Sequence, residues 1–312
     1  MQKTIIIINP LCHQGTGWKR WLSIRSEVLK RLSSNCTELL LEKGVTLKEA
    51  LSKHWQQQEP ALLISAGGDG SIHYLVNYLL KEAKESVPNV SIGAIGLGSS
   101  NDFLKPFGEK IKGVPLRINM ANETMHDVGV ATFYDDTNAE HKKFFLINAS
   151  VGVTAQANWN FNHPDNVLRW LKTRASGAAI IYTALSTILR HRNNPLSLVV
   201  NNSKFNTSVS NINILKLPFV SGSFFYKQPI SHNDGQLALN VCMNMSRTEL
   251  LSILNQLQKG KFPDSNKTLS EFTTNIDISS EQDFIFECDG ETGKTRSLNV
   301  TVLPGALSIL KD

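Results

Sequence analysis

The chain has 312 residues, a length that corresponds to about two domains. Hydrophobic residues make up 41% and charged residues 19%, which is typical of a soluble globular protein. The net charge of +5 is compatible with anionic substrates or an anionic membrane surface, and we expect no nucleic-acid partner.

The cysteines and the apolar runs exclude several further classes. Cys12, Cys36, Cys242 and Cys288 are widely scattered, which argues against a zinc site and against a disulfide scaffold, and fits a reducing compartment. The first apolar run, residues 5–8, is too short for a signal peptide. Residues 177–189 fall short of the roughly 20 residues that cross a bilayer. We therefore expect a cytoplasmic protein.

The first 122 residues alternate short apolar runs with amphipathic runs. Strands are expected at 5–8, 39–41, 61–64 and 91–95, and helices at 18–32, 46–57 and 71–81. Such alternation predicts a parallel, doubly wound α/β sheet. In sheets of this kind, ligands bind at the carboxyl ends of the strands.

Glycine-containing loops follow the first, third and fourth of these strands. The second loop reads Gly67-Gly68-Asp69-Gly70-Ser71 and leads directly into a helix. Glycine lets the backbone approach a phosphate closely, and a helix N-terminus attracts anions. Because Asp69 would repel phosphate unless a divalent cation mediates, the loop indicates a nucleotide–metal site. The alternative is a plain strand-to-helix turn, with Ser71 as helix cap and Asp69 solvated.

After residue 122 the pattern becomes mainly antiparallel β-sandwich or barrel. Strands are expected at 126–133, 143–148, 196–200, 204–209, 211–216, 236–242, 274–278, 283–288 and 297–303. Helices are expected at 167–191 and 246–259. This organisation predicts a nucleotide-binding domain at 1–122 and a β-sandwich substrate and catalytic domain at 123–304. The apolar end, residues 305–312, is interpreted as returning to the first domain.

Five ordered motifs together resemble one family over nearly the whole chain. They are Asn9-Pro10 with its glycine loop, Gly67 to Ser71, Gly98-Ser99-Ser100-Asn101-Asp102-Phe103, Asn233-Asp234-Gly235 and Asp289-Gly290-Glu291. The chain resembles the bacterial diacylglycerol kinase-like lipid kinases, relatives of sphingosine and ceramide kinases. Its first domain is more distantly similar to NAD kinase and phosphofructokinase. The resemblance implies ATP- and Mg²⁺-dependent transfer of a γ-phosphoryl group to a hydroxyl of a lipid such as diacylglycerol.

The resemblance also implies roles for particular residues. The implied nucleotide-contacting residues are Asn9, Gly67, Gly68, Asp69, Gly70, Ser71, Ile72, His73, Ser99, Asn101 and Asp102. Asp69 would organise the catalytic magnesium, and Glu291, next to Asp289, takes the position of the proton acceptor. Asp234 marks a second, structural magnesium site, helped by backbone oxygens of Ser231 and Gln236. By local sequence alone, both acidic motifs of the second half are more typical of tight turns than of functional sites. Since Glu291 lies in the second domain, the active site is expected in the cleft between the domains.

The stretch 159–192 is the candidate for lipid contact, because cations flank its apolar run. The alternative is a helix packed on the sandwich with a solvated basic end. The expected partners are ATP, a lipid alcohol and, transiently, the inner face of the membrane, and a homodimer is left open. Two other functions stay open: a kinase of the same superfamily with a soluble acceptor such as NAD or a sugar phosphate, and a non-catalytic nucleotide-binding regulator.

Overall fold

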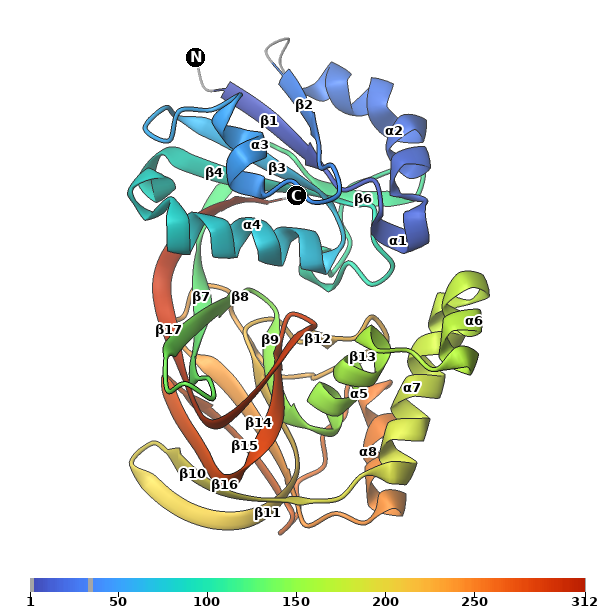
Figure 1. Cartoon of the computed structure of the whole chain (residues 1–312), viewed down its shortest axis with the longest axis vertical. Helices are drawn as coiled ribbons and strands as arrows, with labels where there is room; N and C mark the ends of the chain where they lie inside the picture. The colour runs from blue at the N-terminus through green and yellow to red at the C-terminus, as the bar shows by residue number, and fades with distance from the viewer. Residues whose placement is uncertain (1–2, 33–35, 312) are drawn as a thin grey trace. The chain divides into compact units, whose positions relative to one another are not determined.

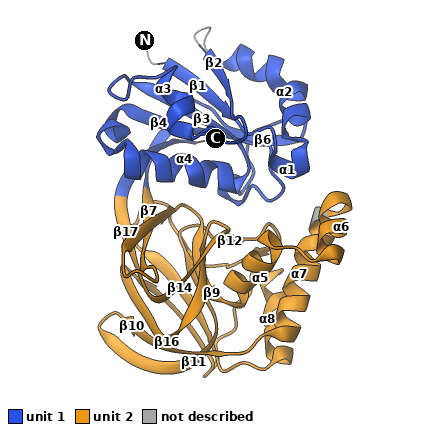
Figure 2. Ribbon diagram, viewed as in Figure 1, with its two compact units in different colours: residues 1–126, 305–312 blue, residues 127–304 orange. Residues whose placement is uncertain are grey.

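The computed structural model describes residues 3–32 and 36–311 (Figure 1). Contacts divide the chain into two compact units, residues 1–126 with 305–312 and residues 127–304 (Figure 2). The chain passes from one unit to the other within strand β7 (Glu123–Tyr134) and again within strand β17 (Glu291–Leu310). The functional division that the sequence suggests at residue 122 stays a prediction.

Unit 1 is built on a parallel sheet with the strand order β2-β1-β3-β4. The end of β17 adds a further parallel pairing to β4, at Ser308 and Ile309. The strands of this unit are β1 (Lys3–Ile8), β2 (Cys36–Leu40), β3 (Ala61–Gly67), β4 (Val90–Gly96), β5 (Lys110–Ile111) and β6 (Val114–Arg117). The short strand β6 pairs antiparallel with β4 at the same edge.

Helices cover both faces of this sheet. Trp21, Ile24 and Val28 of α2 pack into one cluster with Ile6 and Ile8. Because successive strand side chains point to opposite faces, and all four isoleucines of β1 are buried, the other face must also be covered. Figure 1 shows α3 and α4 there. The helices are α1 (Cys12–Gly15), α2 (Gly17–Arg31), α3 (Leu47–Ser52) and α4 (Asp69–Glu82), with 3₁₀ turns η1 (Lys84–Asn89) and η2 (Asp102–Leu104).

Unit 2 is mainly antiparallel, in the order β15-β14-β11-β10-β16-β17, and β9 pairs with both β11 and β16. Its core is a cluster of aliphatic and aromatic side chains that includes Phe145, Val151, Ile212 and Phe286. The additional strands are β8 (Glu140–Phe145), β9 (Asn148–Gly152), β10 (Asn194–Val200), β11 (Ser203–Leu215), β12 (Phe219–Val220), β13 (Phe224–Phe225), β14 (Leu237–Met243), β15 (Thr268–Thr273) and β16 (Asn275–Cys288). The α/β class of the first half and the β-sandwich class of the second are confirmed.

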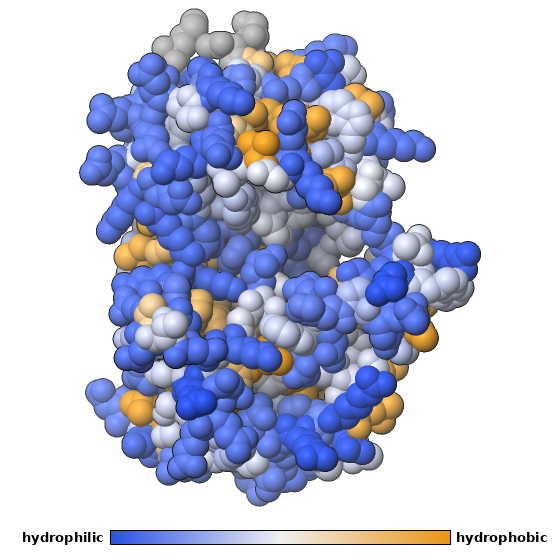
Figure 3. All heavy atoms as spheres, in the orientation of Figure 1, coloured by the Kyte–Doolittle hydropathy of each residue, from blue (hydrophilic) through white to orange (hydrophobic). Residues whose placement is uncertain are grey.

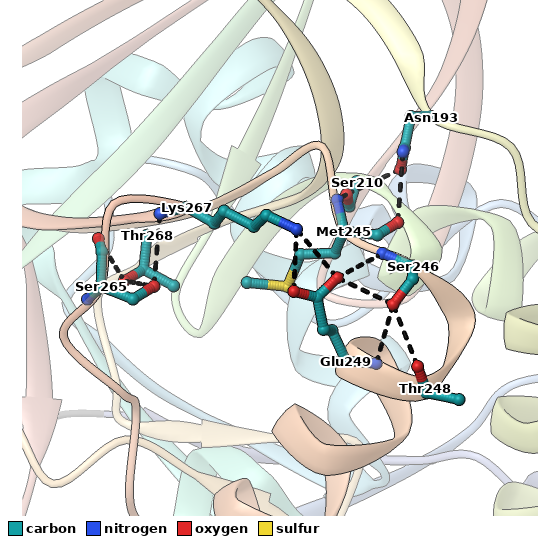
Figure 4. A network of polar contacts seen from close by, with 9 residues as sticks. All are labelled: Asn193, Ser210, Met245, Ser246, Thr248, Glu249, Ser265, Lys267 and Thr268. Carbon is teal, nitrogen blue, oxygen red and sulfur yellow. Dashed lines mark hydrogen bonds and ion pairs between the residues drawn. The ribbon is translucent and has the colours of Figure 1, made fainter.

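Four helices complete unit 2, namely α5 (Val153–Asn162), α6 (Asn166–Arg174), α7 (Ser176–Arg190) and α8 (Arg247–Leu257). The start of α8 is fixed by a capping box, in which Ser246 accepts from the Glu249 N–H and Glu249 accepts from the Ser246 N–H. Figure 4 shows how Lys267 extends this network, with its Nζ 2.8 Å from Glu249 Oε1. The adjacent Met245 N–H donates to Ser210 Oγ of β11 at 2.8 Å, which anchors the helix start to the sheet.

The structure differs from the sequence-based elements at several places. The stretch 167–191 is two helices, because Ala175 has the non-helical angles φ −153° and ψ 84°. The strands expected at 204–209 and 211–216 are one strand, β11, with a bulge between Val209 and Asn211. Strand β15 was not expected, and the helix expected at 46–57 ends at Ser52. Among the residues the structure describes, no helix has both the length and the apolarity to cross a membrane.

Candidate active site

The glycine turn after β3 is built by close backbone packing. Gly67 ends β3, Gly68 precedes α4, and Asp69 is the first residue of that helix. A Cβ on Gly67 would collide with the side chain of Ser71, so a larger residue does not fit there. Gly70 is exposed in the first helical turn, where backbone N–H groups have no intrahelical acceptor. The turn therefore presents N–H groups and the positive end of α4 at the carboxyl end of the strand.

The loop after β4 lies directly against this turn. The N–H groups of Leu97 and Gly98 donate to Gly67 O at 2.7 and 3.1 Å. A Cβ on Gly98 would collide with the backbone of Gly68, so the two turns touch backbone to backbone. Asn101 holds the loop in shape, since its Oδ1 accepts from the Gly98 N–H at 3.1 Å. Asn101 itself has φ +50°, a conformation that asparagine tolerates better than most residues.

The loop after β1 joins the same place. The Asn9 N–H donates to Ala66 O at 2.9 Å, and Asn9 Nδ2 donates to Ser71 Oγ at 3.1 Å. Farther along this loop, His13 Nδ1 lies 2.9 Å from Oγ of the exposed Ser99. The three glycine-containing loops predicted to converge are therefore in contact within unit 1.

Arg20 of α2 was missed by the sequence reasoning, which stopped at the loop before the helix. Its Nη1 donates to the carbonyls of Leu97 and Gly98 at 2.6 and 2.7 Å. Partial burial lowers the pKa of the His13 imidazole, and the nearby Arg20 charge lowers it further. Arg20 thus brings a fixed positive charge to the loops, and His13 is biased toward its neutral form.

The acidic residues of unit 1 have different surroundings. Asp69 is half-buried, and its Oδ1 accepts from the Phe103 N–H at 3.0 Å. Asp102 is buried and pairs with Lys105 Nζ at 2.7 Å. The side chains of Ile72 and His73 are also buried, and His73 Nε2 lies 3.2 Å from Asn77 Nδ2 within α4. Ile72 and His73 of α4 were predicted to contact the nucleotide. Because their side chains are buried, a nucleotide would reach their backbone N–H groups more readily than their side chains.

In unit 2, Asp289 and Gly290 form the tight turn between β16 and β17, with φ values of +49° and +91°. The Asp289 carboxylate accepts from three consecutive backbone N–H groups, those of Leu146, Ile147 and Asn148, at 3.0, 2.9 and 3.1 Å. Asp289 consequently ties this hairpin to the connection between β8 and β9. The motif Asp289-Gly290-Glu291 thus forms a hairpin turn, and the Asp289 carboxylate holds this turn in place.

Glu287 lies two residues before this turn, and the sequence analysis did not single it out. Its side chain is 0% exposed. Oε1 accepts from Asn148 Nδ2 at 2.6 Å and from Ser150 Oγ at 2.8 Å, and Oε2 accepts from the Gly290 N–H at 2.7 Å. Burial raises the pKa of the Glu287 carboxyl to about 7. The available signal was an acid inside the apolar strand that runs from Phe284 to Cys288.

Glu291 is the exposed acid of this hairpin. It is the first residue of β17, paired across the turn with Cys288. Lys143 Nζ donates to the backbone carbonyl of Glu291 at 3.3 Å and to that of Thr292 at 3.0 Å, which fixes the strand without engaging the carboxylate. Of Glu287, Asp289 and Glu291, the last is the one that an outside hydroxyl group can reach.

Two of the oxygens expected to bind a second magnesium, Asp234 Oδ1 and the Gln236 carbonyl oxygen, accept hydrogen bonds from a lysine instead. Nζ of Lys216 donates to Asp234 Oδ1 at 2.8 Å, to the Gln236 carbonyl at 2.7 Å and to Asp127 Oδ2 at 2.8 Å. Ser231 Oγ donates to Asn233 Oδ1 at 2.9 Å. An ammonium therefore lies where the resemblance implies a cation. In the described part of the chain, no group of three or more His, Cys, Asp or Glu side chains is arranged to hold a metal ion.

Helices α6 and α7 carry exposed apolar side chains beside basic ones. On α7, Ile181, Leu185 and Leu189 recur every fourth residue and are exposed, whereas Thr183, Thr187 and Ile188 on the other side are buried. We call the exposed set the apolar–basic surface: Val167, Trp170, Ile181, Leu185 and Leu189 with Arg169, Arg174 and Arg190. Figure 3 shows apolar atoms among hydrophilic ones along these helices.

Comparison with known proteins assigns both halves of the chain. The family described as "Diacylglycerol kinase catalytic domain" matches residues 3–132, and the one described as "YegS C-terminal NAD kinase beta sandwich-like domain" matches residues 148–311. A Staphylococcus carnosus protein named "Putative lipid kinase" is 21% identical over 96% of this chain and 94% of that protein. "Putative lipid kinase YtlR" of Bacillus subtilis is 27% identical, over 51% of this chain and 50% of its own length.

Solved structures have the same fold. A Bacillus anthracis structure described as a diacylglycerol kinase aligns with a TM-score of 0.66 and 18% identity, over 100% of this chain and 97% of that one. A second, described as "a putative diacylglycerol kinase" from the same organism, gives a TM-score of 0.70 at 19% identity with the same coverage.

Proposed function

This chain belongs to the diacylglycerol kinase-like lipid kinase family, and we propose that it transfers the γ-phosphoryl group of ATP to a hydroxyl of a lipid such as diacylglycerol. The observation that carries the proposal is the contact among the three glycine-containing loops at the carboxyl ends of β1, β3 and β4. Phosphoryl transfer needs mainly positioning and neutralisation of phosphate charge, and these loops are suited to both.

Each part of this loop cluster has a role in the proposal. The backbone of Gly67 to Ser71 and the N-terminus of α4 bind phosphate oxygens, and Arg20 adds positive charge behind the loop at Gly98. Asn9, Ser99, Asn101 and Asp102 shape the rim and floor around the nucleotide. Asp69 supplies a carboxylate of the kind that Mg²⁺ accepts together with substrate phosphates, and the bound ion would neutralise charge on those phosphates.

Glu291 is proposed as the general base that accepts the proton of the lipid hydroxyl, because it is exposed and sits on a fixed turn. Asp289 and Glu287 act as positioning residues through their bonds to the backbone of that turn and its neighbours. Neither contacts the substrate in this proposal. Replacement of Glu291 should therefore lower kcat while leaving ATP binding intact.

The apolar–basic surface is proposed to contact the anionic face of a membrane, where the lipid substrate resides. Exposed apolar stripes flanked by cations are typical of interfacial helices. We propose the cytoplasmic face of the membrane, because ATP and anionic lipid headgroups are both present there. Cosedimentation with phosphatidylglycerol vesicles should fall when Leu185 and Leu189 are both replaced by Asp. Leu22→Asp, on α2, is the matched control, because Leu22 is 52% exposed and Leu189 56% exposed.

The test of activity is transfer of radiolabel from γ-labelled ATP, with extracted lipids, NAD and sugar phosphates as parallel acceptors. We expect label in the lipid fraction, about a 10²–10⁴-fold loss in Glu291→Gln, and wild-type activity in Glu281→Gln, an exposed glutamate of β16. Label in NAD or sugar alone would favour the soluble-acceptor kinase. ATP binding without transfer to any acceptor, unaffected in cells by Glu291→Gln, would favour the regulator.

A further inference from the structure

The loop that precedes β14 is folded around the side chain of a buried lysine. Lys216 directly follows β11, and its side chain is 1% exposed. Burial of an ammonium group is costly unless the charge is paired and every N–H has an acceptor. Lys216 meets both conditions, because its three N–H groups are matched by Asp127 Oδ2, Asp234 Oδ1 and the Gln236 carbonyl at 2.7–2.8 Å.

The two carboxylates are also engaged by backbone N–H groups. Asp127 Oδ2 accepts from the Gly235 N–H at 2.7 Å, and Asp234 Oδ1 accepts from the Gln236 N–H at 3.0 Å. The Asp127 N–H donates to the His232 carbonyl at 2.8 Å. The loop from His232 to Gln236 is thus folded around one ammonium and two carboxylates, with bonds to β7 and to the end of β11.

A divalent cation does not fit the same oxygens together with Lys216. Magnesium binds oxygen at about 2.0–2.1 Å, so an ion bound to both Asp234 Oδ1 and the Gln236 carbonyl would lie within about 5 Å of Nζ. The repulsion between the two cations would be strong because the Lys216 ammonium is only 1% exposed, although Asp234 itself is 29% exposed.

We propose that the Lys216 ammonium replaces the second, structural magnesium, so that this chain holds the loop at residues 231–236 without a metal. The proposal rests on contacts within unit 2 and is independent of which acceptor the kinase uses. Its consequence is that the stability of the nucleotide-free protein does not depend on divalent ions, and that removal of the Lys216 charge creates such a dependence.

The experiment compares thermal unfolding in EDTA and in MgCl₂, without nucleotide, and measures divalent metal in the purified protein. For the wild type we expect equal Tm values in both buffers and no stoichiometric metal. Lys216→Met removes the ammonium that bridges Asp127 and Asp234, so its Tm in EDTA should fall by on the order of 10 °C and recover partly in MgCl₂. Lys204→Met, at an exposed lysine of β11, should behave as the wild type.

Asp234→Asn keeps the proposal testable if Lys216→Met does not fold. It should lower Tm and remain insensitive to EDTA, because Lys216 retains Asp127 as its partner. The proposal is overturned if the wild type loses stability in EDTA, regains it with Mg²⁺, and Asp234→Asn abolishes that response. About one equivalent of divalent metal in the wild type, lost in Asp234→Asn, would overturn it equally.

Discussion

Replacement of Glu287 by Gln should remove a specific pH dependence of stability. Burial raises the pKa of this carboxyl from 4.5 to about 7, so the native protein retains a proton between these values while the unfolded chain has lost it. Stability from this group is complete below pH 4.5 and declines as pH rises toward 7. The difference between a pKa of 4.5 and one of about 7, at 1.36 kcal/mol per pH unit, corresponds to about 3 kcal/mol.

The assay is urea unfolding of wild type and Glu287→Gln at closely spaced pH values from 4.5 to 8, followed by circular dichroism. The difference between the two free energies of unfolding cancels the other titrating groups. Gln also replaces one of the two accepting oxygens by an NH₂ group, which adds an offset that does not vary with pH. We expect the wild type to lose about 3 kcal/mol relative to the variant across this range. A difference that stays flat, or that grows in favour of the wild type with pH, would refute the reasoning.

Two further substitutions test the two parts of the candidate site. Gly98→Ala places a Cβ against the Gly68 backbone, so it should cost about 1–3 kcal/mol and weaken ATP binding in calorimetry, whereas Gly177→Ala, in α7 with open space, should be neutral or stabilising. Equal ATP affinity of Gly98→Ala and wild type would contradict the packing argument. Asp289→Asn brings an amide N–H₂ toward backbone N–H groups and should cost about 1–3 kcal/mol in chemical unfolding, with ATP affinity unchanged. An unaltered unfolding curve for Asp289→Asn would show that its three bonds do not hold the turn.

The features that the sequence predicts well are local ones. The apolar run from Ile5 to Ile8 predicts strand β1, and the glycines from Gly67 to Gly70 predict the turn after β3. Both predictions need only a few neighbouring residues, because strand patterning and glycine conformation are local. The fold class follows from such signals, and so does the convergence of the loops, since parallel strands end at one edge of a sheet.

The features that escaped depend on residues far apart in the sequence. Lys216 and Asp127 are separated by 89 positions, and Glu287 and Ser150 by 137, so local patterns contain no sign of either pair. A carboxylate such as Asp234 reads as a metal ligand until the lysine that neutralises it is known. The break at Ala175 escaped for another reason, because the nearby Gly177 was read as the start of the apolar run 177–189.

The backbone contact between the turns at Gly68 and Gly98 has a consequence for engineering. Because the two main chains meet at Gly68 and Gly98 with no space for a Cβ, this part of the proposed phosphate-binding site cannot be altered by choosing different side chains. A redesign for another phosphate donor would have to begin at the exposed positions around it, such as Ser99, and its neighbour His13. Substitutions are therefore unfavourable at Gly68 and Gly98, whereas Ser99 and His13 can be replaced.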